Sequence, residues 1–98
     1  MDPDLRNKTS KLVEKSNQIG VEFLLSDLDT GLTFTDVAIV TNSPGGSSRN
    51  FNKALEVYRT VTRLLPRVSP SADERSRIDS RLAELKRRLE KAGYFIDI

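Results

Sequence analysis

The segment from Val21 to Val40 constrains the fold most, because it carries apolar side chains on two opposite sides of one helix. At 3.6 residues per turn, one side consists of Val21, Leu24, Leu25, Leu28, Leu32, Thr35 and Ile39, and the opposite side of Phe23, Thr30, Phe34 and Val37. A surface helix needs only one apolar stripe, whereas a helix with two has neighbours on both sides. We therefore expect this helix to be the centre around which the rest of the chain packs.

Composition indicates a small helical bundle. The chain has 98 residues, of which 37% are apolar and 31% charged, and this suits one domain with a thin core. It contains neither cysteine nor histidine, so disulfides, thiolate chemistry and imidazole chemistry are excluded. The polar start of the sequence does not resemble a signal peptide, and no apolar run approaches the ~20 residues of a membrane span. We expect a cytoplasmic protein with no membrane partner.

Helix starts and stops divide the chain into three helices. The expected helices cover about residues 4–41, 49–65 and 70–92, with a loop at 42–48 and an apolar tail at 94–98. Pro44 followed by two glycines predicts the loop. Either Ser69 caps the last helix with Pro70 first inside it, or Ser71 caps it and forms a capping box with Glu74. Gly93 predicts its C-terminal end.

The expected fold is all-α, an antiparallel three-helix bundle with a long first helix, because short loops join antiparallel neighbours. The first helix is thinly apolar before residue 20, with Leu5, Leu12 and Ile19 seven residues apart. A break at Gly20 would give four helices, but a glycine costs only ~1 kcal/mol inside a helix. We favour a continuous helix, and we expect the C-terminal tail to emerge near the 42–48 loop.

Part of the sequence resembles a tetratricopeptide repeat. Ala54, Tyr58 and Pro66 match the second helix of that motif, Val61 stands where a smaller residue is usual, and Gly31 and Phe34 are similar to positions of its first helix. The resemblance implies a packed helical hairpin with an interaction role. It does not imply a peptide groove, because Gly31 and Ala54 lie too far apart for the repeat and no second copy follows. The whole pattern is also similar to small uncharacterised bacterial helical proteins, which implies no activity.

The second apolar side of the central helix is the main candidate surface. Phe23, Phe34 and Val37 are either buried within the monomer or form a surface for self-association or a partner protein, since exposed apolar patches mark such sites. Tyr94 and Phe95 of the tail could serve either purpose.

Glu22, Asp29 and Asp36 recur every seven residues along one side of the central helix. A helix spaces them about 10 Å apart, too far for one metal ion to bind two. We expect them to face basic residues such as Arg59 and Arg63. The segment from Ser43 to Arg49 precedes a helix but lacks the closing residues of a phosphate-binding loop, so we interpret it as a plain connection.

These observations predict no enzyme, since no acid, base, nucleophile or metal site is grouped for chemistry, and no cofactor. The leading hypothesis is a small helical protein–protein interaction or self-association module. The alternative is a nucleic-acid-binding domain that uses the basic second and third helices. Its candidate residues are Arg49, Lys53, Arg59, Arg63 and Arg67. The net charge of only +2 disfavours this alternative, because affinity for the phosphate backbone needs concentrated positive charge.

Overall fold

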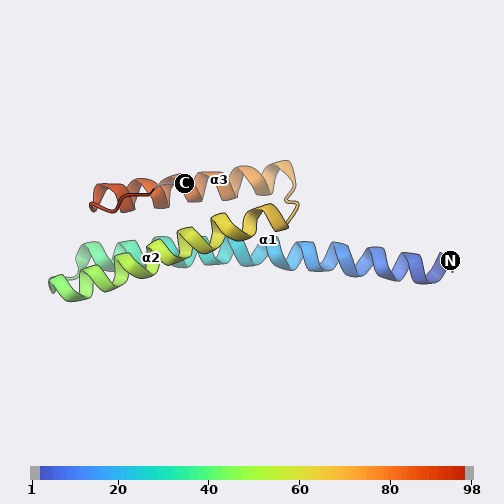
Figure 1. Ribbon diagram of the computed structural model, residues 1–98, viewed down its shortest axis with the longest axis horizontal. Helices are drawn as coiled ribbons and strands as arrows, with labels where there is room; N and C mark the ends of the chain where they lie inside the picture. Colours follow the sequence, from blue (N-terminus) through green and yellow to red (C-terminus); the bar gives the residue numbers. More distant parts are fainter. Residues whose placement is uncertain (1–2, 97–98) are drawn as a thin grey trace.

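The computed structural model describes residues 3–96, with side chains from residue 7 onward. Its elements are α1 (Pro3–Val40), α2 (Pro44–Leu64), a short 3-10 helix η1 (Leu65–Arg67) and α3 (Ala72–Lys91). They form an up–down–up bundle in which α2 runs antiparallel to α1 and α3 runs parallel to it (Figure 1). The predicted all-α three-helix bundle with a long first helix is confirmed. The sequence Asp2-Pro3 also predicts a helix cap at Asp2, which lies outside the described residues.

The long helix α1 continues through both of its glycines, so the four-helix alternative is wrong. A Cβ atom at Gly20 would lie 2.8 Å from Cγ1 of Val68, and one at Gly31 would lie 2.8 Å from Cγ1 of Val57. At both positions the missing side chain lets a residue from beyond α1 pack directly on the helix. Close packing of this kind offsets the small intrinsic cost of glycine in a helix.

The start of α2 differs from the prediction. Ser43 is extended and caps the helix, with its Oγ accepting a hydrogen bond from the Gly46 N–H at 3.5 Å, and Pro44 stands at the first helical position. The connection is therefore residues 41–43, not 42–48. Proline favours the first turn of a helix because its fixed φ suits that position. Gly46 is buried within this turn. A Cβ atom at this position would lie only 2.9 Å from Cγ2 of Thr41, so a larger residue would clash there.

Both ends of α3 follow the sequence signals. Ser71 and Glu74 form the capping box, with the Ser71 N–H donating to Glu74 Oε1 at 2.8 Å and the Glu74 N–H donating to Ser71 Oγ at 3.2 Å. At the other end Gly93 has a φ of +96°, and the Tyr94 N–H donates to the Leu89 carbonyl at 3.0 Å. This is a Schellman ending, which turns the chain back over the bundle.

The core lies between the three helices. Its buried apolar members are Val21, Leu24, Leu28, Ala38, Ala54, Val57, Tyr58, Val61, Leu65, Ile78, Leu85 and Leu89. Thr35 is also fully buried. The predicted inner side of α1 is therefore largely correct, but Ile39 is wrong because it is 65% exposed. Ile39 lies in the last turn of α1, beside an open cavity that it shares with Lys91 and Ala92.

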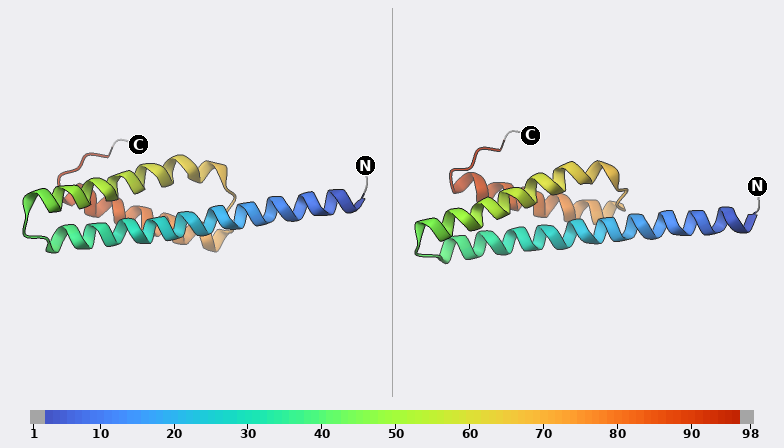
Figure 2. Two further views of the ribbon diagram at one scale, coloured as in Figure 1. Left: turned by 90° about the horizontal axis from the view of Figure 1, so that it is seen from below. Right: turned by 60° about the horizontal axis from the view of Figure 1, so that its bottom comes forward.

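The molecule is elongated, with extents of 61 × 20 × 20 Å and a radius of gyration of 17.0 Å. A compact domain of this length has a radius of gyration of about 13 Å. The difference comes from residues 3–16 of α1, hereafter the arm, which project beyond α2 and α3 (Figure 2). All side chains described between residues 7 and 16 are exposed.

Candidate functional site

The face of α1 that points away from the core carries a continuous row of exposed residues, which we call the outer stripe. Its members are Leu12, Ser16, Ile19, Phe23, Ser26, Thr30, Thr33 and Val37, and all are exposed. They alternate in steps of four and three residues, which is the spacing of a coiled-coil seam. Leu12 is 66% exposed, Phe23 50% and Val37 41%. The stripe therefore presents apolar side chains at the spacing that another helix would bind.

Phe23 and Phe34 both line a groove between α1 and α2. The groove has a volume of about 410 Å³ and is lined by Phe23, Asp27, Phe34, Lys53, Glu56, Val57 and Thr60. Phe34 is half-buried against the core, and Lys53 Nζ lies 5.5 Å from the centre of its ring, a favourable cation–π geometry. Burial raises the pKa of the Asp27 carboxyl above its usual range. Of the two phenylalanines in the predicted surface, Phe34 therefore belongs partly to the core, whereas Phe23 remains largely accessible to solvent.

The tail residues lie on a different side of the bundle from this groove. The ring of Tyr94 lies 5.7 Å from that of Phe51, and its hydroxyl donates to the Ser48 carbonyl at 3.4 Å. Phe51 and Lys53 are two positions apart on α2, so they point to nearly opposite sides of that helix. Tyr94 thus lies near the start of α2, as expected, but it does not join Phe34. Phe95 is 86% exposed, and the last two residues of the predicted tail lie outside the described part.

Two of the three carboxylates Glu22, Asp29 and Asp36 on α1 form ion pairs with α3. The expected pairing of this acidic row with Arg59 and Arg63 is therefore wrong. Asp29 Oδ1 lies 3.0 Å from Arg81 Nε, and Asp36 Oδ1 lies 2.9 Å from Arg88 Nη1. Because α1 and α3 run parallel, carboxylates seven residues apart meet arginines seven residues apart in the same order. Glu22 accepts a hydrogen bond from the Gln18 side chain at 3.3 Å instead.

Arg88 organises the polar contacts between α1 and α3. Besides Asp36, its guanidinium donates to Thr35 Oγ1 at 2.9 Å and to Glu84 Oε1 at 2.9 Å. Hydrogen bonds from Arg87 and then Arg88 hold the pKa of the Glu84 carboxyl below its usual range. This network borders the cavity beside Ile39, which measures about 630 Å³. Every carboxylate that lines this cavity is engaged by arginine, so the network has a structural role.

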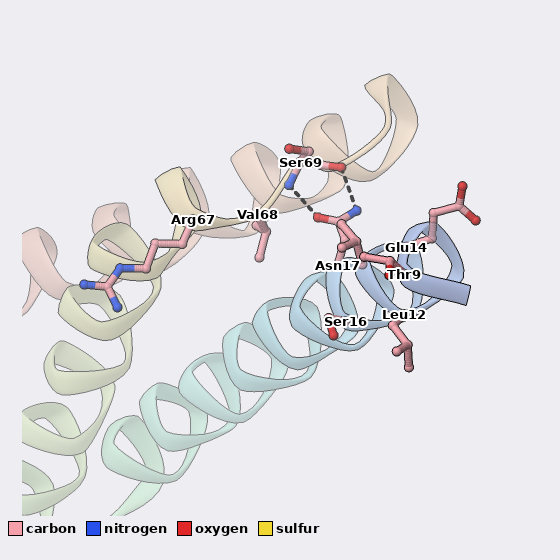
Figure 3. Close-up of a pocket in the computed structure, with 9 residues that line it drawn as sticks. Thr9, Leu12, Glu14, Ser16, Asn17, Arg67, Val68 and Ser69 are labelled. Atoms are coloured by element: carbon pink, nitrogen blue, oxygen red, sulfur yellow. Dashed lines mark hydrogen bonds between the residues drawn. The ribbon is translucent and has the colours of Figure 1, made fainter. Parts of the chain in front are cut away.

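The arm leaves the bundle at a polar junction (Figure 3). The Asn17 side chain donates to the Ser69 carbonyl at 3.0 Å and accepts from the Ser69 N–H at 2.6 Å. A cavity of about 610 Å³ lies beside this pair and includes Leu12, Val13 and Val68 in its lining. Leu12 points away from Val68 (Figure 3). Asn17 therefore fastens α1 to the turn before α3, and Leu12 and Val13 of the arm remain about two-thirds exposed.

The basic residues of α2 and α3 differ in whether they form ion pairs. On α3, the six cations Arg75, Arg77, Arg81, Lys86, Arg87 and Arg88 form ion pairs, whereas Lys91 forms none with any described residue. On α2 and η1, the exposed residues Arg49, Arg59, Arg63 and Arg67 form no ion pair with any described residue. Of the five candidates for nucleic-acid binding, four thus remain free and Lys53 covers Phe34.

Within the described side chains, no group of three acidic residues lies close enough to hold a metal ion. None of the helices between residues 3 and 96 combines the length and apolar character needed to cross a membrane. No protein-family model, curated protein or solved structure matches the chain. The outer stripe is therefore the feature on which a functional proposal can rest.

Sequence reasoning found the centre of the outer stripe but not its extent. Leu12 and Ile19 lie on the same face as Phe23 and Val37, because steps of four and three residues continue from the arm into the bundle. The seven-residue spacing of Leu12 and Ile19 was the available signal. In the sequence this spacing indicates only a thinly apolar first helix, whereas the structure shows one continuous exposed row.

Proposed function

We propose that the protein is a small helical self-association module whose binding surface is the outer stripe of α1. The observation that carries this proposal is a row of eight exposed residues at coiled-coil spacing from Leu12 to Val37, of which Leu12, Ile19, Phe23 and Val37 are apolar. Exposed apolar patches on soluble proteins mark interaction sites. The likeness of the α1–α2 hairpin to a tetratricopeptide repeat also supports an interaction role.

The test is the mass of the protein in solution, measured by light scattering from about 1 to 500 μM, the range in which weak dimers form. We expect the mass to rise toward that of a dimer, and Phe23→Ala to shift this rise to higher concentration. Ile39→Ala is the matched control, because Ile39 is equally apolar and exposed on α1 but points away from the outer stripe. A wild-type chain that stays monomeric throughout would refute the proposal.

A second candidate function is nucleic-acid binding by α2. It is favoured by one observation, the set of exposed arginines on α2 and η1 that no carboxylate neutralises. We expect any such binding to appear in a mobility-shift assay at low salt, to weaken steeply as salt rises, and to disappear in the double variant Arg59→Glu/Arg63→Glu. The control is Arg75→Glu/Arg77→Glu, which changes paired residues of α3 by the same charge. Absence of binding at low salt would eliminate this candidate.

A further inference from the structure

The arm projects beyond α2 and α3, and its side chains described from residue 7 to residue 16 are all exposed. It extends for about 20 Å at 1.5 Å per residue, yet its apolar residues Leu12 and Val13 are both about two-thirds exposed. Isolated helices of this length are marginal in water, and most gain their stability by packing an apolar face. A helical arm with apolar residues therefore calls for a partner surface that lies outside the monomer.

The charges beside the outer stripe indicate what that partner is. One flank of the stripe carries a charged residue at every seventh position, namely Lys8, Lys15, Glu22, Asp29 and Asp36. The row is basic on the arm and acidic on the bundle. In a parallel dimer this flank would face the other flank of the second copy, which consists of Val13, Gly20, Asp27 and Phe34 and offers no cation to the acidic half. An antiparallel copy brings the charged flanks together and places the basic half of each helix beside the acidic half of the other.

We propose that the outer stripe binds the arm of a second copy of the chain in antiparallel orientation, so that each arm lies on the bundle part of the other α1. This inference rests on the self-association proposed above and specifies its geometry. The two bundles then lie end to end on either side of a two-fold axis, and each arm fills the space beside the other's α1. Such an interface is isologous, with the same residues contributed by both copies.

Charge also selects the register. Coiled-coil positions repeat every seven residues, so antiparallel registers differ in steps of seven. One register pairs Lys8 with Asp29 of the second copy and Lys15 with Glu22 of the second copy. A shift of one step in one direction places Glu22 against its own equivalent, and a shift in the other direction places Lys15 against its own equivalent. Only the first register places no like charges of the row opposite each other, and it leaves Asp36 beyond the last lysine of the second copy.

The same register joins the apolar residues of the stripe. It places Leu12 against Phe23 of the second copy, and Ile19 beside Ser16 of the second copy. On the other flank, Val13 falls opposite Gly20 of the second copy, where the Val68 side chain already packs against the helix. The Asp29 carboxylate already pairs with Arg81 but is 61% exposed, so it can accept a second cation.

The size of the contact predicts its strength. In this register about 30 residues of each helix overlap, which corresponds to a strip about 45 Å long and about 10 Å wide. The two copies together would bury about 1,000 Å², which lies at the lower end of specific interfaces. We therefore expect a reversible dimer with a dissociation constant in the micromolar range.

The register is tested by charge reversal. Lys15→Glu and Glu22→Lys should each weaken the dimer by about tenfold or more, because each converts two symmetry-related attractions into repulsions. An equimolar mixture of the two variants should restore wild-type association, since every pair in the mixed dimer is again complementary. Lys11→Glu is the control, because Lys11 lies on the same arm but points away from the stripe. Failure of the mixture to restore binding overturns the proposed register.

The orientation is tested by distances between spin labels, for which the cysteine-free chain is a clean background. A label at Thr33→Cys should report a separation of about 46 Å along the helix axis in the proposed dimer, and a shift of one register step would change this by about 10 Å. A parallel dimer would bring the labels side by side. A dimer with a short label distance would overturn the antiparallel geometry and leave self-association standing. A strictly monomeric wild type would overturn both.

Discussion

Adjacent residues on α1 offer the most direct test of which faces hold the monomer together. Leu24 is 1% exposed within the core, whereas Phe23 is 50% exposed on the outer stripe. We predict that Leu24→Ala and Phe23→Ala will differ strongly in their effect on the free energy of unfolding, although both remove a large apolar side chain from the same helix.

The expected magnitudes follow from burial. Leu24→Ala removes a fully packed side chain and leaves a cavity, which costs about 2–5 kcal/mol. Phe23 buries about half of its side chain in the monomer, so its truncation loses about 1 kcal/mol of apolar burial. Alanine recovers several tenths of a kcal/mol through its higher helix propensity. The net loss for Phe23→Ala should therefore stay below about 1 kcal/mol, against a total stability of about 5–15 kcal/mol for a domain.

The assay is urea unfolding followed by circular dichroism, at a concentration where light scattering shows the wild type to be monomeric. The Leu24→Ala midpoint should fall clearly, while the Phe23→Ala midpoint should stay close to wild type. At high concentration the wild type should gain stability from association and Phe23→Ala should gain less. Equal losses for both variants in the monomer would refute the reasoning, because Phe23 would then belong to the core.

Three further predictions concern the contacts around the bundle. Arg88→Met should lower the free energy of unfolding by about 2 kcal/mol in a urea titration, because Arg88 donates to the buried Thr35 hydroxyl. The control Arg87→Met changes a largely exposed side chain and should lower the free energy of unfolding by less than about 1 kcal/mol. The pKa of the Glu84 carboxyl is lowered by Arg87 and Arg88, so its contribution to stability is present above about pH 4.5 and is lost as the pH falls through the lowered value. Glu84→Gln should accordingly flatten the acid side of a stability–pH curve, and an unchanged slope would contradict this assignment. Deletion of residues 1–14 should leave the unfolding midpoint of the monomer unchanged, because the described side chains of the arm are exposed. The same deletion should abolish the concentration-dependent rise in mass. A large loss of monomer stability would show instead that the arm packs on its own bundle.

Local signals in the sequence predicted α3 well and α2 less well. The ends of α3 are determined by residues that interact only with near neighbours in the sequence, as Ser71 and Gly93 do. The bounds of α3 can therefore be predicted from the local sequence alone. The start of α2 depends on Gly46, whose missing side chain admits Thr41 of the connection. That contact depends on how the chain turns between the two helices, and a pair of glycines after Pro44 is equally typical of a loop.

The partners of the acidic row required knowledge of helix placement. Asp29 and Asp36 could be assigned a basic neighbour from charge alone, but both α2 and α3 carry arginines at suitable spacing. The choice between them depends on which helix lies beside that face of α1. The buried hydroxyl of Thr35 and its bond to Arg88 were missed for the same reason, since threonine at a core position carries no signal for a distant arginine.

The arrangement of charge along α1 unites these observations. The acidic half of the helix is partly neutralised by α3 within the monomer, through Arg81 and Arg88. The basic half, with Lys8 and Lys15, extends where neither α2 nor α3 reaches. A monomer needs no exposed apolar residues on this projecting half, and an arm that served only for solubility would carry charges without Leu12 or Val13. An antiparallel two-fold dimer of the proposed kind requires an apolar seam, a flank whose charge reverses along the helix, and a bundle that covers only one half of that helix. The helix α1 combines all three features.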